Sequence, residues 1–135
     1  MKEMTVEAVP SSIPVVTGFI NNELKALGCS FKTQAEIDVA VDEMLANIAF
    51  YAYAPDTGTA TVRLEVEEEP RTVVITFLDH GIPFNPLERR DPKVRLPAAE
   101  RKIGGLGIYI VKKCMDSVTY RYKDGENILQ IKKKL

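Results

Sequence analysis

Two neighbouring segments constrain the fold most strongly. Residues 59–67 alternate polar and apolar side chains, with Val62, Leu64 and Val66 on one side, which is typical of a strand with one buried face. Residues 72–78 are almost continuously apolar, which indicates a strand buried on both faces. The turn-forming sequence Glu-Glu-Pro-Arg lies between the two segments. The pair therefore predicts an antiparallel hairpin inside a sheet.

The remaining periodicity predicts the elements around this hairpin. Strands are expected over residues 2–9, 117–123 and 128–134, and helices over residues 11–28, 33–54 and 104–115. Asp124-Gly125 is a strong signal for a two-residue hairpin turn. A serine at position 11 or 12 is expected to cap the first helix, and Thr33 with Glu36 forms a capping box for the second. The order of elements predicts an α+β sandwich, with helices packed on one face of a mainly antiparallel mixed sheet.

Length and composition restrict the class of protein. A chain of 135 residues predicts one domain over residues 1–135. A net charge of -1 and a pI near 5.9 argue against general nucleic-acid binding. Cys29 and Cys114 are expected to be reduced, buried thiols of a cytosolic protein. No apolar run approaches the length of a membrane span, and the N-terminus lacks the pattern of a signal peptide.

Glu43 and Asn47 form the first candidate site. They lie on one strip of the predicted second helix, beside its apolar stripe. A carboxylate can act as a general base, and an amide oxygen is a ligand that Mg²⁺ accepts. Solvated Glu and Asn residues at this spacing are also common in ordinary helices, so the pair alone leaves both interpretations open.

Asp79 and Gly81 form the second candidate, at the end of the apolar strand. An aspartate can accept a hydrogen bond from the exocyclic amine of a nucleobase, and a nearby glycine lets a flat ring approach the backbone. The same Asp-x-Gly pattern is frequent in plain turns. His80, the single histidine of the chain, is expected to be a partly exposed loop residue.

The third candidate is the sequence Gly-Gly-Leu-Gly at residues 104–107, which opens the helix predicted over residues 104–115. Free backbone N–H groups at a helix start bind phosphate. No Gly-Lys-Ser/Thr follows, so this is no Walker loop, and no strand leads into it as a dinucleotide fingerprint requires. Glycine clusters also occur as simple helix starts.

The segment between the second and third candidates shows no convincing periodicity and is rich in proline and basic residues. A loop this long in a compact domain is functional or disordered. We expect residues 85–103 to be a lid that becomes ordered when nucleotide binds, with a short helix near residues 97–100. Arg101 and Lys102 supply positive charge that can reach phosphates.

The order of the three motifs resembles the N, G1 and G2 boxes of the Bergerat-fold ATPase/kinase superfamily, which includes gyrase-type ATPases and histidine-kinase catalytic domains. Within it, the chain is most similar to the anti-sigma regulatory factor serine/threonine kinases of the RsbW type. The segments DEMLANIAFYAY, FLDHGIPFNPL and GGLGIYIVKKCMD carry the resemblance, which extends over nearly the whole chain. It implies a Bergerat fold with ATP and Mg²⁺ as ligands.

The resemblance also implies a role for each candidate residue. Glu43 would be the base that activates the attacking hydroxyl group, and Asn47 would bind the Mg²⁺ that bridges the ATP phosphates. Asp79 would accept the adenine amine, in a pocket shaped by Gly81. The phosphates would be held at the helix start by Gly104, Gly105, Leu106 and Gly107, with Arg101 and Lys102 reaching them from the lid.

Two positions depart from the family pattern. Tyr51 stands where a histidine often follows the metal-binding asparagine, so the environment of the phosphates is altered. Asn127 stands where a threonine often helps to bind adenine. Because an asparagine can still form hydrogen bonds, Asn127 is expected to contribute to adenine binding.

The function implied is that of a cytoplasmic, ATP-dependent anti-sigma factor. It would sequester a sigma factor and phosphorylate a serine or threonine of an anti-anti-sigma antagonist protein. The alternative is an ATP-responsive protein-binding switch without significant kinase activity, which Tyr51 leaves open. A nucleotide-independent scaffold would make the three boxes a coincidence. Members of this family are often dimers, so the N-terminal strand or first helix is a candidate homodimer interface; no direct nucleic-acid or membrane partner is expected.

Overall fold

The computed structural model describes residues 1–88 and 105–135. In chain order its elements are β1 (Lys2–Glu7), the 3-10 helix η1 (Pro10–Ser12), α1 (Ile13–Ala26), α2 (Phe31–Asn47), the π-helix η2 (Ile48–Ala52), β2 (Thr59–Glu67), β3 (Thr72–Asp79), the 3-10 helix η3 (Pro86–Glu88), α3 (Gly105–Cys114), β4 (Ser117–Lys123) and β5 (Glu126–Lys134). The short helix predicted near residues 97–100 and most of the predicted lid lie outside the described residues.

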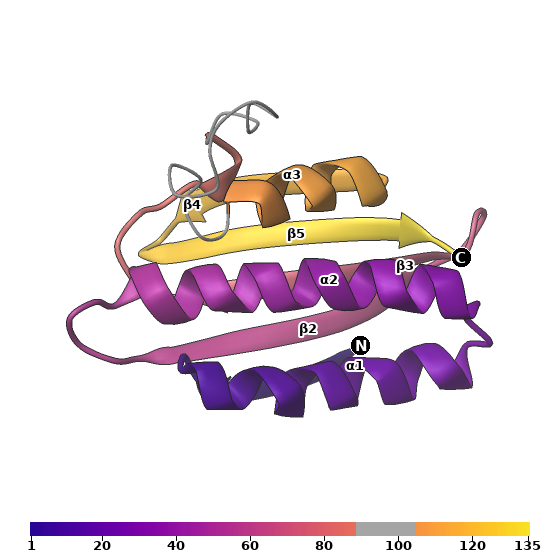
Figure 1. The fold of residues 1–135 in the computed structure, drawn as a ribbon, viewed down its shortest axis with the longest axis horizontal. Coiled ribbons are helices and arrows are strands. Elements are labelled where there is room, and N and C mark those ends of the chain that lie inside the picture. The colour runs from indigo at the N-terminus through magenta and orange to yellow at the C-terminus, as the bar shows by residue number, and fades with distance from the viewer. Residues whose placement is uncertain (89–104) are drawn as a thin grey trace.

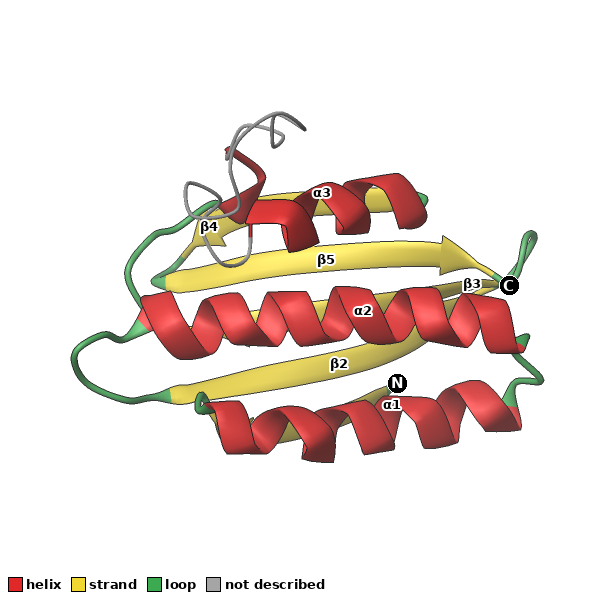
Figure 2. Ribbon diagram, viewed as in Figure 1, coloured by secondary structure: helices red, strands yellow, loops and turns green. Residues whose placement is uncertain are grey.

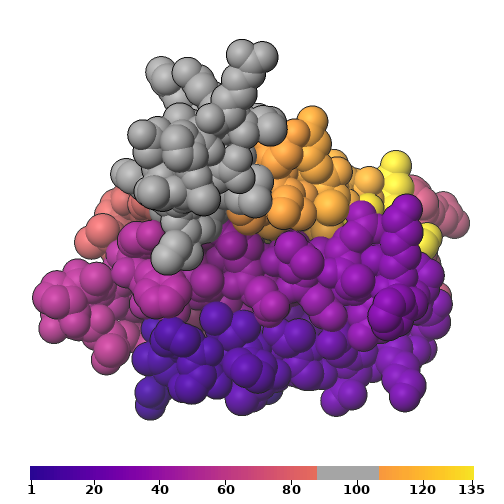
Figure 3. Space-filling model, in the orientation of Figure 1, coloured from indigo at the N-terminus to yellow at the C-terminus, as the bar shows by residue number. Residues whose placement is uncertain are grey.

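The five described strands form one sheet in the order β1-β2-β3-β5-β4. Figure 1 shows α1, α2 and α3 lying over one face of this sheet, and Figure 2 shows the same division into a helical and a strand layer. In the space-filling view, helix atoms cover most of this face (Figure 3). The predicted α+β sandwich is confirmed.

Every pairing of the described strands is antiparallel, which agrees with the mainly antiparallel sheet that the sequence predicts, although no parallel pair occurs among the described strands. The chain does return through α3 to a strand that runs parallel to β3, namely β4. However, the β4–β5 hairpin places β5 between them, so β4 lies at the edge of the sheet and does not pair with β3.

The hydrophobic core lies between the helices and the sheet. β2 alternates as predicted, because Val62 and Leu64 are buried while Glu65 is exposed. β3 is buried along almost its whole length, since it lies between β2 and β5 under the helices. Burial of one large apolar side chain contributes about 1.5–3 kcal/mol. The largest fully buried side chains include Phe77, Ile20, Leu24, Ile37, Met44 and Ile75.

The start of α2 differs from the prediction. The helix begins at Phe31, and the Thr33 N–H donates to the Ser30 hydroxyl oxygen at 3.2 Å. Ser30 has the extended backbone that an N-cap requires. The predicted capping box with Thr33 and Glu36 is therefore wrong, because Thr33 is a donor to the cap and not the cap itself.

The start of α1 also differs, because Ser12 makes no capping hydrogen bond through its side chain. The preceding turn η1 gives Ser12 helical dihedrals, with φ -80° and ψ -18°, and a helical cap residue cannot direct its hydroxyl group to the first free N–H groups. The predicted end of α1 is confirmed, since Gly28 follows it with a φ of 72°. Such a φ favours glycine.

The predicted turn between the last two strands is confirmed. Asp124 and Gly125 have φ values of 52° and 79°, as a two-residue hairpin turn of the type I′ class requires. Cys29, between α1 and α2, and Cys114, the last residue of α3, are free thiols as expected, but they are only half-buried. Burial raises the pKa of each thiol. Within residues 1–88 and 105–135, no helix combines the length and apolar character that a membrane span needs.

Candidate functional site

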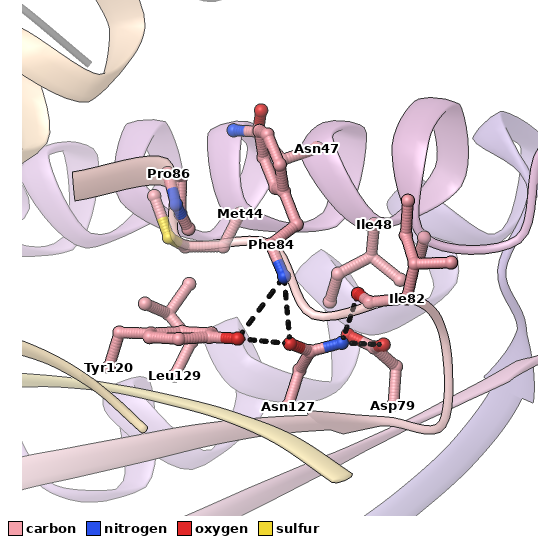
Figure 4. A pocket seen from close by; sticks show the side chains of 11 residues that line it. Met44, Asn47, Ile48, Asp79, Ile82, Phe84, Pro86, Tyr120, Asn127 and Leu129 are labelled. Atoms are coloured by element: carbon pink, nitrogen blue, oxygen red, sulfur yellow. Dashed lines mark hydrogen bonds between the residues drawn. The ribbon is translucent and has the colours of Figure 1, made fainter. Parts of the chain in front are cut away.

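Three elements that are distant in sequence line one pocket. The end of α2, the end of β3 and the start of β5 meet there, as Figure 4 shows. The walls are mostly apolar and contain a few polar groups, which is typical of small-molecule sites. Asn47, Asp79 and Asn127, all predicted from the sequence, lie in it together. The lining residues are Met44, Asn47, Ile48, Ala52, Asp79, Ile82, Phe84, Pro86, Tyr120, Asn127 and Leu129.

Asp79 is the last residue of β3, and only 5% of it is exposed. Its Oδ1 accepts hydrogen bonds from Asn127 Nδ2 at 2.8 Å and from the Gly81 backbone N–H at 2.9 Å. Among the described residues, none donates to Oδ2. Burial raises the pKa of Asp79, and the two hydrogen bonds oppose this effect. A carboxylate with one oxygen held and the other available suits an amine donor.

Packing within the protein requires a glycine at position 81. A Cβ atom at this position would lie 2.3 Å from the Ala52 carbonyl oxygen, and the next residue, Ile82, donates its N–H to that same oxygen at 2.9 Å. The loop after β3 therefore packs directly against η2, the π-helical turn that ends α2. The sequence indicated a glycine near a ring, but the close approach is to backbone, which only the tertiary structure reveals.

Tyr53 fixes the other side of this loop. Its hydroxyl group donates to the Thr59 carbonyl oxygen at 2.7 Å and accepts the His80 backbone N–H at 2.8 Å. Gly58 leaves room for the ring, because a Cβ there would lie 2.4 Å from it. Sequence reasoning missed Tyr53, since nothing in its local pattern distinguishes it from a packing residue. His80 itself is exposed, as predicted.

Glu43 and Asn47 contact each other on α2. Asn47 Nδ2 donates to the Glu43 carbonyl oxygen at 2.9 Å and to Glu43 Oε1 at 3.2 Å. Only 5% of Asn47 is exposed, and Glu43 is half-buried. Because the amide nitrogen is engaged, the orientation of the Asn47 side chain is fixed, and Oδ1 has no donor among the described residues.

The start of α3 lies against Glu43. A Cβ atom on Gly107 would lie 2.1 Å from Glu43 Oε2, so the glycine lets the carboxylate approach the first turn of the helix. α3 begins at Gly105, with Leu106 in its first turn, so the predicted helix opening is confirmed. Arg101, Lys102 and Gly104 lie outside the described residues.

Two aromatic residues, Phe84 and Tyr120, line the pocket, and a third, Tyr51, packs on Phe84. Tyr51, 39% exposed, lies in η2, and its ring packs against that of Phe84 with a centroid separation of 5.5 Å and an interplanar angle of 32°. Tyr120 enters from β4. Sequence reasoning did not assign Tyr120 to the site, although its position between the exposed Thr119 and Arg121 of the predicted strand is a signal that could have found it. No sequence signal assigned Phe84 to the pocket.

The donor set around Asn47 fits a magnesium ion. The described residues contain no cluster of three or more His, Cys, Asp or Glu side chains able to hold a metal, which makes a cage built from the protein alone unsuitable. Mg²⁺ typically takes one or two protein oxygens and completes its octahedron with water and phosphate oxygens. The oriented carbonyl oxygen of Asn47 suits that role.

Three relatives of this chain are named as protein kinases. The chain is 29% identical over 111 residues to the serine-protein kinase RsbW of Listeria monocytogenes serotype 4a, covering 78% of this chain and 69% of that protein. It is 27% identical over 127 residues to the serine-protein kinase RsbW of Halalkalibacterium halodurans, covering 91% and 76%. It is 24% identical over 102 residues to the serine/threonine-protein kinase BtrW of Bordetella bronchiseptica, covering 76% and 71%.

The resemblance to the RsbW-type kinases, which the three motifs indicated, is thereby confirmed over most of the chain. The sequence model of the histidine kinase-like ATPase domain matches residues 6–133, from β1 through β5. The chain therefore belongs to the histidine kinase-like ATPase domain family.

Proposed function

We propose that this chain is an ATP-dependent protein serine/threonine kinase of the anti-sigma type. It binds a sigma factor and phosphorylates a serine or threonine of the antagonist protein that releases this sigma factor, and it does so in the cytoplasm. Family membership and the names of the relatives as serine-protein kinases support the kinase class. The observation that carries the proposal is the contact of Glu43 with both Asn47 and Gly107 beside the Asp79 pocket.

The described residues take the following roles. Asp79 accepts the amine of adenine through Oδ2, inside the apolar walls of the pocket. Asn47 holds Mg²⁺ through Oδ1, and this ion neutralises charge on the phosphates. Backbone N–H groups at the start of α3, in the residues Gly105, Leu106 and Gly107, hold phosphate oxygens at the positive end of the helix dipole.

Glu43 acts as the general base. It accepts the proton of the serine hydroxyl group as the hydroxyl oxygen bonds to the γ-phosphorus of ATP, and the bond from that phosphorus to the β,γ-bridging oxygen breaks, releasing ADP. The hydrogen bond from Asn47 keeps the carboxylate beside the metal ligand. In such transfers, positioning and electrostatic stabilisation supply most of the catalysis.

The second candidate function is an ATP-responsive binding module without significant kinase activity. One observation favours it, namely that Tyr51 stands where a histidine is usual and packs on Phe84. Tyr51 supplies no imidazole to the phosphate side of the site, and its ring is engaged with that of Phe84. Such a module would exchange protein partners when ATP binds, through a shift in conformational populations.

A paired measurement separates the two functions. The purified chain is incubated with labelled ATP and candidate antagonist proteins, and ATP affinity is measured by calorimetry on the same samples. Glu43→Gln should keep ATP affinity within about threefold and lower phosphotransfer by about 10²–10⁴-fold, the usual contribution of a general base. Asn47→Ala should lower both, because the metal ligand is removed.

Glu36→Gln is the matched control, since Glu36 lies on the same helix near its other end, where it pairs with Lys133 at 3.7 Å. It should leave both quantities unchanged. Wild-type phosphotransfer by Glu43→Gln would refute the assignment of the base. A wild-type chain that binds ATP and a sigma factor but phosphorylates no antagonist would establish the binding module instead.

A further inference from the structure

Asn127 occupies the centre of the hydrogen-bond network in the pocket, as Figure 4 shows. It lies directly opposite Asp79 in the register of β3 and β5, and only 5% of it is exposed. Its Nδ2 donates to Asp79 Oδ1 at 2.8 Å and to the Ile82 carbonyl oxygen at 2.9 Å. Its Oδ1 accepts from the Phe84 N–H at 3.2 Å and from the Tyr120 hydroxyl group.

These contacts use the full capacity of the side chain. A primary amide has two N–H donors and two acceptor lone pairs, and each is engaged by a group of the chain itself. Nδ2 also lies 3.4 Å from the Gly81 carbonyl oxygen. A bound base would therefore have to displace one of these partners before Asn127 could contact it, and each displaced buried group would lose its own hydrogen bond.

Asp79, unlike Asn127, keeps one acceptor oxygen without a donor among the described residues. Its Oδ1 is engaged by Asn127 and by the Gly81 N–H, while no described residue donates to Oδ2. The pocket thus presents one carboxylate oxygen to an incoming amine. The position of that oxygen depends on the bond that Asn127 makes to its neighbour, because rotation of the Asp79 carboxylate would break the 2.8 Å contact.

We infer that Asn127 is a positioning residue for the Asp79 carboxylate and does not itself contact the base. It holds Asp79 by Oδ1 and ties the segment 81–84 to β5, so that Asp79 Oδ2 alone selects a base with an exocyclic amine. This replaces the direct adenine contact that the family resemblance implies for this position. The inference rests on the proposed function, because it concerns the same nucleotide pocket.

Tyr120 fixes the orientation of the amide. Its hydroxyl group donates to Asn127 Oδ1 and accepts the Phe84 N–H at 3.2 Å. If the amide were reversed, its oxygen would face the Asp79 carboxylate and its nitrogen would face the Phe84 N–H. Both contacts would then be repulsive, so Tyr120 and Phe84 together keep Nδ2 directed at Asp79.

The test compares ATP with purine riboside triphosphate, which lacks only the 6-amino group. Wild type should bind ATP about 10- to 100-fold more tightly, as expected for a hydrogen bond to a charged acceptor. Asn127→Ala should reduce this ratio to below about threefold, since Asp79 is no longer held in place. Tyr120→Phe, which leaves the contacts of Asn127 with Asp79, Ile82 and Phe84 in place, should give an intermediate ratio.

Gln130→Ala is the matched control. Gln130 lies on β5, on the face of the sheet away from the helices. The substitution removes an amide that donates to the Thr76 hydroxyl oxygen at 3.1 Å. The ratio for this variant should equal that of wild type. Asn127→Ser serves as a second variant if Asn127→Ala does not fold, and the same loss of discrimination is expected of it.

Amide hydrogen exchange of Phe84 supplies a second measurement that needs no nucleotide. The tie to β5 predicts protection in wild type and faster exchange in Asn127→Ala. If Asn127→Ala weakens both nucleotides equally and keeps the wild-type ratio, the positioning role is refuted and only a structural one remains. If wild type binds neither nucleotide, the proposed function fails, and this inference fails with it.

Discussion

At the scale of single residues, two glycines allow neighbouring groups to approach the backbone closely at the site. Gly81 lies against the backbone of Ala52, and Gly107 lies against the carboxylate of Glu43. Adding a side chain at these two glycines should have different effects on stability. An added Cβ at Gly81 would meet a fixed carbonyl group, whereas one at Gly107 would meet the end of a side chain that can rotate away. Substitution at Gly107 should therefore change chemistry more than stability.

Gly107→Ala tests this expectation. The new Cβ would lie 2.1 Å from Glu43 Oε2 and would force the carboxylate to move. Phosphotransfer should fall by about 10²-fold or more, as it does on loss of a general base. The free energy of unfolding should stay within about 1 kcal/mol, because alanine is also the better helix former.

Gly18→Ala is the control for the helix-propensity effect. Gly18 lies in α1, and an added Cβ there would meet nothing within 4 Å. This variant should gain about 0.5–1 kcal/mol of stability with unchanged phosphotransfer. Full activity in Gly107→Ala would show that the contact between Gly107 and Glu43 has no catalytic role.

Asp79→Asn should separate stability from binding. Burial raises the pKa of Asp79 above its ordinary value of 3.8, so in the folded protein the carboxyl group holds its proton to a higher pH than in the unfolded chain. The stability of wild type should therefore fall as pH rises from about 3.8 through the raised pKa. The asparagine variant lacks this loss, and its stability relative to wild type should grow over the same pH range.

The binding arm of this experiment has the opposite sign. At neutral pH, Asp79→Asn should weaken ATP binding by about 10- to 100-fold, since a charged acceptor is replaced by a donor. Denaturant unfolding at several pH values and calorimetry with ATP check the two arms. A variant that is less stable than wild type at every pH, by a constant amount, would contradict the expected effect of burial.

The sequence predicted the polar residues of the site better than their surroundings. Asn47, Asp79 and Asn127 stand in motifs whose order is informative, and they lie in one pocket. Tyr53 and Phe84 could not be assigned, because their roles depend on contacts with residues far away in the chain. A hydroxyl group that meets the His80 N–H leaves no trace in local periodicity.

At the scale of elements, strong periodicity was sufficient to place an element, but the sequence did not predict the single hydrogen bonds that set helix starts and turns. The alternation of residues 59–67 gave β2 its correct bounds. The start of α2 was misplaced by two residues, because Ser30 and Thr33 are both good caps and the choice depends on backbone dihedrals. The π-helical turn η2 was also missed, since the Ile82 N–H that binds its Ala52 carbonyl comes from the distant loop after β3.

The two helix starts predict different responses to loss of a serine. Ser30→Ala removes the acceptor of the Thr33 N–H and should cost about 0.5–2 kcal/mol of unfolding free energy. Ser12→Ala removes no capping bond and should change stability by less than about 0.5 kcal/mol. Urea denaturation of both variants checks the difference, and equal losses would contradict the assignment of Ser30 as the cap.

At the scale of the whole molecule, the pocket joins elements of both the helical layer and the sheet. Its residues come from α2, the end of β3, β4 and the start of β5, and Glu43 links it to α3. The sheet order makes this possible, since placing β5 between β3 and β4 sets Asp79 beside Asn127. A ligand in this pocket contacts helical and strand layers together, so its binding free energy adds to the stability of the whole fold.

Mg-ATP should therefore raise the melting temperature of the entire chain in one transition. Ligand at about 100-fold excess over Kd adds about 2.7 kcal/mol, and 1 kcal/mol shifts Tm by about 2–8 °C in domains of this size range, so a rise of about 5–20 °C is expected. Chelation of Mg²⁺ should remove part of the rise in wild type and little in Asn47→Ala, whose metal ligand is already lost. GTP, whose base carries a carbonyl group where adenine has the amine, should give a much smaller shift, because that oxygen would face Asp79 Oδ2. A melting temperature that millimolar Mg-ATP leaves unchanged would exclude nucleotide as the ligand of this pocket, and a rise that is equal for ATP and GTP would exclude Asp79 as the residue that selects the base.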